Sequence, residues 1–148
     1  MLSGIEGILS LAAASGEDLA TTSDIITDAL TAFGKTASDA GHFSDVLAVA
    51  ASSANTTVSG MGETFKYAAT MAGTLGYEVE DVALAAGLMA NSSIKGSMAG
   101  TSLNAIITRL ATNTSGARDA IEALGVGFFN ADETARPFRD VMDDLRTA

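Results

Sequence analysis

The sequence predicts an all-α fold of about seven to eight short helices, packed as antiparallel αα-hairpins. Apolar residues recur at helical spacing along most of the chain. Glycines fall mostly between these periodic segments, where they are suited to end helices. A single proline and very few clusters of β-branched residues argue against a sheet protein.

The first half of the chain predicts four helices, over residues 3–14, 23–33, 43–54 and 59–73. Ser23 and Ser59 are expected to be N-caps, because a serine hydroxyl accepts a hydrogen bond from the free amides of a first helical turn. Gly16 and Gly34 are expected to end the first two helices, and the glycines from 73 to 76 the fourth.

The second half predicts four more helices, over residues 79–91, 98–112, 115–124 and 137–145. Ser115 is the expected N-cap of the third of these, and Gly125 its stop. Pro137 suits the first position of the last helix, where no backbone donor is needed. Between these two helices, residues 126–130 are expected to form one short strand-like loop.

No internal linker divides the chain, so residues 1–148 are expected to form a single helical domain. A loose self-similarity between Gly16–Leu30 and Gly76–Leu88 suggests repeated αα-hairpins. The last helix is still amphipathic where the sequence stops at Ala148. We therefore expect the domain to be a fragment of a much longer polypeptide.

The composition is strongly acidic, with a net charge of −10 and a pI near 4.2. Such a chain repels phosphate backbones, and we expect no direct binding to nucleic acid. A solvated surface that aids solubility is the simplest interpretation, and an acidic surface for a basic partner is the alternative. The longest apolar run, Val82–Ala90, is about half the length of a membrane span, so no transmembrane segment is predicted.

No residue pattern predicts catalysis, a cofactor or a metal site. His42 is the single histidine and cysteine is absent, so the usual nucleophilic and metal-binding sets are incomplete. The segment Lys95–Gly96–Ser97 resembles the end of a phosphate-binding loop, but the upstream glycine and the GKS order are missing. We expect a protein that is not an enzyme.

The most informative stretch runs from Ser93 to Leu110. Gly96 is expected to adopt a left-handed conformation that turns the chain, and Ser97 to cap the helix that follows. A glycine at position 100 costs roughly 1 kcal/mol relative to alanine within a helix. Such a cost is tolerated where another backbone passes close by, so the stretch predicts a tightly packed helical corner.

This stretch also resembles the core region of phage tail tape measure proteins, which are phage minor tail proteins. Members of that family carry a G-I-K-G-S-x-A-G-T-x-L-R type of turn and helix ending in R-L, preceded by an E-D helix start and an A-N helix end. The matching residues here are Gly76, Glu80, Asp81, Asn91, Lys95, Gly96, Ser97, Ala99, Gly100, Thr101, Leu103, Arg109 and Leu110. The chain departs from the pattern at Ser93, where glycine is frequent, and at Asn104, where a basic residue is common.

The resemblance implies a structural virion protein that sets tail length, nucleates tail tube assembly and leaves the tail ahead of the DNA. Its implied partners are tail tube and tail assembly chaperone proteins, with self-association as a further option. Its implied location is the tail lumen of the virion, and the host bacterial cytoplasm during assembly. The alternative is an acidic helical protein-interaction module unrelated to phage.

Overall fold

The computed structural model describes residues 2–112 and 116–148, and these residues form eight α-helices with no sheet. This confirms the all-α prediction. The helices are α1 (Leu2–Ser15), α2 (Leu19–Ala32), α3 (Ala40–Ser53), α4 (Val58–Thr74), α5 (Val79–Asn91), α6 (Gly96–Thr112), α7 (Ala117–Glu122) and α8 (Phe138–Thr147). A 3-10 turn (Ala37–Asp39) precedes α3, and an antiparallel bridge joins Phe129 to Ala135 beside the predicted strand-like loop.

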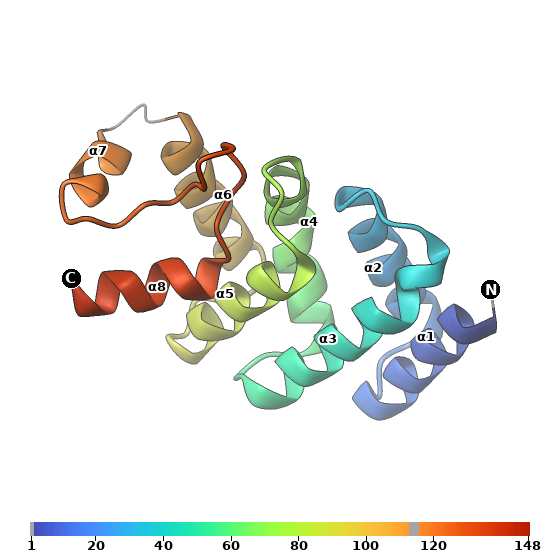
Figure 1. The fold of residues 1–148 in the computed structure, drawn as a ribbon. Helices are drawn as coiled ribbons and strands as arrows, with labels where there is room; N and C mark the ends of the chain where they lie inside the picture. The colour runs from blue at the N-terminus through green and yellow to red at the C-terminus, as the bar shows by residue number, and fades with distance from the viewer. Residues whose placement is uncertain (1, 113–115) are drawn as a thin grey trace.

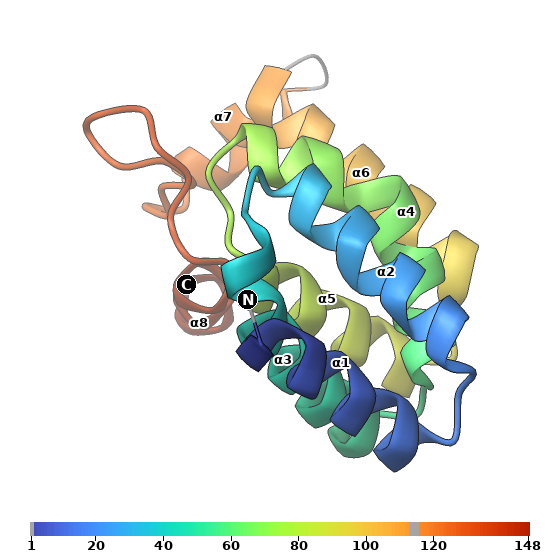
Figure 2. The ribbon, with the colours of Figure 1, turned by 90° about the vertical axis from the view of Figure 1, so that its right-hand side faces the viewer.

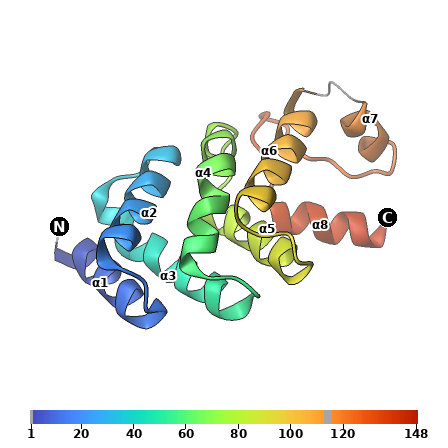
Figure 3. The same cartoon turned by 180° about the vertical axis from the view of Figure 1, so that it is seen from behind.

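The helices lie in two layers (Figures 1 and 3). One layer holds α1, α3 and α5 side by side, and the other holds α2, α4 and α6. Consecutive helices cross between the layers, but the most extensive packing joins helices two apart, above all α4 with α6 and α1 with α3. Because every second helix returns to the same layer, the helices of a layer run in the same direction. Figure 2 views the two layers from the α1 end.

Buried side chains recur at equivalent points of α2, α4 and α6. Ile26, Phe65 and Leu103 are buried at intervals of 39 and then 38 residues. These intervals match the length of a two-helix repeat. The self-similarity noted in the sequence would instead align α2 with α5, which lie in opposite layers. The hairpins therefore repeat, but in a different register from the one that the sequence pattern suggested.

Several predicted helix starts were wrong. The second helix begins at Leu19, where the Asp18 carboxylate accepts a hydrogen bond from the Thr21 amide at 3.1 Å, so Ser23 lies within α2. The cap of α4 is Thr57, which accepts from the Gly60 amide at 3.0 Å, and not Ser59. In both cases an earlier residue of a good capping type satisfies the same free amides first.

The third helix also begins earlier than predicted, at Ala40 and not at Phe43. Its entry is fixed by a capping box in which the Thr36 amide donates to Asp39 Oδ2 at 2.9 Å. Pro137 immediately precedes α8 and is not its first residue. The predicted cap Ser115 lies outside the described residues.

Ser93 is one of two non-glycine residues with positive φ in the described chain, at 69°. It ends α5 in the left-handed conformation, with Ile94 donating to the Met89 carbonyl at 2.9 Å. A side chain there costs about 1–2 kcal/mol. Ser93→Gly is therefore expected to raise the free energy of unfolding by about 0.5–1 kcal/mol, after the larger unfolded-state entropy of glycine is deducted.

Chemical denaturation followed by circular dichroism measures this gain. The matched control is Ser92→Gly, because Ser92 has a φ of −92° and glycine has nothing to relieve there. The control is expected to lose stability. Equal losses in both variants would show that Ser93 is not strained.

Candidate functional site

The stretch from Ser93 to Leu110 forms the turn after α5 and nearly all of α6. Gly96 has a φ of 56°, which confirms the expected left-handed conformation, and it is already the first residue of α6. Ser97 therefore lies inside the first turn, and the prediction that it caps the helix was wrong. The turn is shared by two left-handed residues, Ser93 and Gly96, and not made by the glycine alone.

The predicted close approach of a second backbone occurs at Gly100. A Cβ atom at this position would lie 2.5 Å from the carbonyl oxygen of Thr64 and 2.9 Å from the Cβ of Tyr67, both on α4. Ala99 beside it is fully buried. The Thr64 hydroxyl, itself buried, lies 3.1 Å from the Gly96 carbonyl oxygen and donates toward it. Backbone and side-chain contacts thus hold the start of α6 against α4.

The same device occurs at the other contacts within each layer. A Cβ on Gly73 of α4 would lie 2.5 Å from the Ala32 carbonyl oxygen of α2. A Cβ on Gly4 of α1 would lie 2.6 Å from the Ala37 carbonyl oxygen in the turn before α3. Glycine therefore allows a backbone to approach at three successive steps of the fold, and the glycine of the motif is one of them.

The remaining motif residues of the corner divide into buried and exposed groups. Leu103 is buried in the main core, and Leu110 in a smaller cluster with Val126, Phe128 and Val141. Asn91 Oδ1 accepts a hydrogen bond from the Asn55 amide at 2.8 Å, which ties the end of α5 to the loop before α4. The exposed residues are Lys95, Ser97, Thr101 and Arg109. Arg109 occupies the last turn of α6, where its charge complements the helix dipole as expected.

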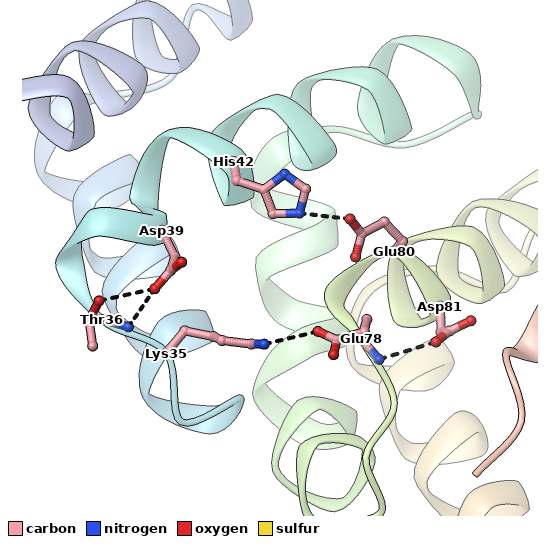
Figure 4. A network of polar contacts seen from close by, with 7 residues as sticks. All are labelled: Lys35, Thr36, Asp39, His42, Glu78, Glu80 and Asp81. Carbon is pink, nitrogen blue, oxygen red and sulfur yellow. Dashed lines mark hydrogen bonds and ion pairs between the residues drawn. The ribbon is translucent and has the colours of Figure 1, made fainter. Parts of the chain in front are cut away.

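Gly76, Glu80 and Asp81 lie at the opposite end of α5, in the polar network of Figure 4. Gly76 has a φ of 84° and turns the chain after α4. Asp81 accepts a hydrogen bond from the Glu78 amide at 3.1 Å and completes a capping box at the start of α5. Its other carboxylate oxygen accepts one from the Phe138 amide at 2.7 Å, so the same side chain also holds the start of α8.

Two ion pairs link the α2–α3 corner to the start of α5. His42 Nε2 lies 2.7 Å from a Glu80 carboxylate oxygen, and Lys35 Nζ lies 3.1 Å from one of Glu78 (Figure 4). All four side chains are well exposed, so each pair contributes at most about 1 kcal/mol. The single histidine thus pairs with a motif residue, a contact that its sequence neighbours did not reveal.

The perturbed ionisable groups near this network have structural causes. Burial raises the pKa of the Tyr77 phenol, and the Asp81 carboxylate adds to the shift. Hydrogen bonds from the Thr36 amide and hydroxyl lower the pKa of Asp39, the capping carboxylate of the turn before α3. Within residues 2–112 and 116–148, no group of three acidic, histidine or cysteine side chains could hold a metal ion. The motif residues follow three helices and do not converge on one pocket.

Asp81→Ala is expected to lower the free energy of unfolding by about 1–2 kcal/mol, because it removes a helix cap and leaves the Phe138 amide without its acceptor. Hydrogen exchange at α8 is expected to rise more than at α4. Denaturation and exchange mass spectrometry measure the two effects. The matched control is Glu80→Ala, which removes an adjacent exposed carboxylate; equal effects from both would rule out this link between α5 and α8.

The comparisons with known proteins agree with the sequence resemblance. The model of a family described as phage-related minor tail protein matches residues 1–148. The chain is 39% identical over 148 residues to a tape measure protein of Pneumococcus phage Dp-1, covering all of this chain and 13% of that relative. It is 27% identical over 140 residues to a probable tape measure protein of Escherichia phage P2, covering 95% of this chain and 17% of that relative. The chain thus spans less than a fifth of either relative, and no solved structure matches it.

Proposed function

This chain belongs to the phage-related minor tail protein family, and we propose that it is a compact helical segment of a tape measure protein. The observation that carries the proposal is the 39% identity, over all 148 residues, to a protein named as a tape measure protein. Family membership leaves the alternative of a helical interaction module unrelated to phage without support.

The arrangement of the motif residues supports a structural role without catalysis. Gly100 admits the backbone of α4, Asp81 joins the starts of α5 and α8, and Asn91 holds the loop before α4. Each of these residues is thus engaged in packing, capping or connecting helices. None of the described helices is long and apolar enough to cross a membrane.

In the proposed role the segment belongs to a ruler that lies in the tail lumen, sets tail length and leaves ahead of the DNA. Tail tube subunits and a tail assembly chaperone are its partners, first in the bacterial cytoplasm and then in the virion. The net charge of −10 favours contacts with proteins over contacts with DNA. A helix rises about 1.5 Å per residue, so a tail on the order of 1,000 Å requires several hundred residues. This segment is then one folded part of a longer ruler.

A tandem duplication of residues 1–148 within the full-length protein tests this role. A segment that belongs to the ruler lengthens the tail when it is duplicated, and one copy stays intact to support assembly. Electron microscopy of purified tails measures the change. An unchanged tail length would exclude the segment from the ruler.

A further inference from the structure

The helix α1 lies at one end of its layer and carries an apolar stripe on its free side. Ile5 is 55% exposed and Leu9 is 47% exposed. The two residues lie one helical turn apart, and Ala13 continues the stripe one turn further on. Both large side chains are thus open to solvent on a single face of the first helix.

The stripe faces away from the neighbouring helix of the layer. Gly7 packs closely on α3, since a Cβ at this position would lie 2.7 Å from the Cα of Gly41. Each residue of an α-helix turns by about 100°, which places Leu9 about 200° around the axis from Gly7. The stripe therefore occupies the flank where a further helix would lie if the layer continued (Figure 3). A helix that is apolar on both flanks is normally covered on both.

The charge distribution indicates what can cover this flank. Two copies of a chain with a net charge of −10 repel each other, and least where the surface carries few charges. The 14 residues of α1 contain one charged side chain, Glu6. Carboxylates are exposed on the outer sides of other helices, including Asp28 of α2, Asp45 of α3 and Asp140 of α8. The free flank of α1 is therefore the apolar surface on which copies of this chain repel each other least.

We propose that this flank is a contact between two copies of the chain, with α1 packed against α1 about a two-fold axis. A two-fold axis makes the same stripe meet itself, so Ile5 of one copy packs near Leu9 of its partner. A helix of 14 residues offers a strip about 21 Å long and about 10 Å wide. This is far below the roughly 800 Å² per partner of a stable interface, so the dimer is weak and forms only at high concentration.

A second apolar surface competes with this assignment. The groove between α3 and α5 has a volume of about 550 Å³ and exposes Val49 and Leu88. Its rim, however, carries the charged side chains of Asp45, Glu80 and Arg139. Two copies meeting there would bury these charges, which is costly unless each finds a partner.

Sedimentation equilibrium of this chain, over about a hundredfold range of concentration, tests the proposal. The average mass is expected to rise from that of one chain toward that of two. The double variant Ile5→Gln/Leu9→Gln is expected to stay monomeric throughout, with unchanged helical circular dichroism. The matched control Val49→Gln/Leu88→Gln removes two equally exposed apolar side chains and is expected to dimerise like the original. A control that stays monomeric would place the contact in the α3–α5 groove, and an original chain that stays monomeric would overturn the proposal.

Cysteine cross-linking locates the contact independently of stability. The chain has no cysteine, so each introduced thiol is unique. An equimolar mixture of the Ile5→Cys and Leu9→Cys chains is expected to form covalent dimers under mild oxidation, because facing positions bring the Cβ atoms within disulfide range. A mixture of Val49→Cys and Leu88→Cys chains is expected to remain largely uncoupled. Equal cross-linking of both mixtures would contradict a contact through α1.

Discussion

Gly100→Ala is expected to lower the free energy of unfolding by about 2 kcal/mol. The added methyl group would lie 2.5 Å from the Thr64 carbonyl oxygen, which belongs to the backbone of α4 and cannot rotate away. Overpacking of this kind costs typically about 1–3 kcal/mol, and here α4 and α6 must separate along the most extensive helix contact of the fold. The gain of about 1 kcal/mol in helix propensity offsets only part of the cost. The melting temperature is expected to fall by about 4–8 °C.

The comparison that isolates steric overlap is Gly87→Ala, a glycine of α5. Its added Cβ would meet only the Cβ of Ala54, at 3.3 Å, near the end of α3. That contact is relieved by a small shift, so the stability of this variant is expected to stay within about 1 kcal/mol of the original chain. Thermal and chemical denaturation of both variants measure the difference. If Gly100→Ala proved as stable as Gly87→Ala, α6 could not pack against α4 as described.

The positions of the helices were largely predictable because apolar periodicity is a local signal. The bounds of α5 match the expected 79–91, since an acidic first turn marks its start. The starts of α2 and α4 were missed because several capping residues follow one another there, and the sequence does not show which of them satisfies the first free amides. Asp18 and Thr57 take that role ahead of Ser23 and Ser59.

The contacts between helices were predictable only in kind. Gly100 indicated that a backbone passes close by, but the sequence could not identify α4 as that backbone. The hydrogen bond from the Phe138 amide to Asp81 joins residues 57 positions apart, and locally Asp81 indicates only a helix start. The two-layer order depends on packing between every second helix, which periodicity within a single helix does not encode.

The length of tails built with a duplicated segment tests the proposed role most directly. A compact chain of 148 residues has a radius of gyration of about 15 Å and is about 40 Å across. The same residues drawn out as one continuous helix would cover about 220 Å. The two arrangements therefore differ about fivefold in the length that they add to a ruler.

A folded segment within a tape measure protein predicts that duplication of residues 1–148 lengthens the tail by about 40 Å. Mean lengths from many tails, imaged by electron microscopy with and without the duplication, give the increment. A second duplication that carries Gly100→Ala in the added copy is the control for its folding. An increment near 220 Å would show that these residues act as an extended helix, and an increment of zero would contradict their place in the ruler.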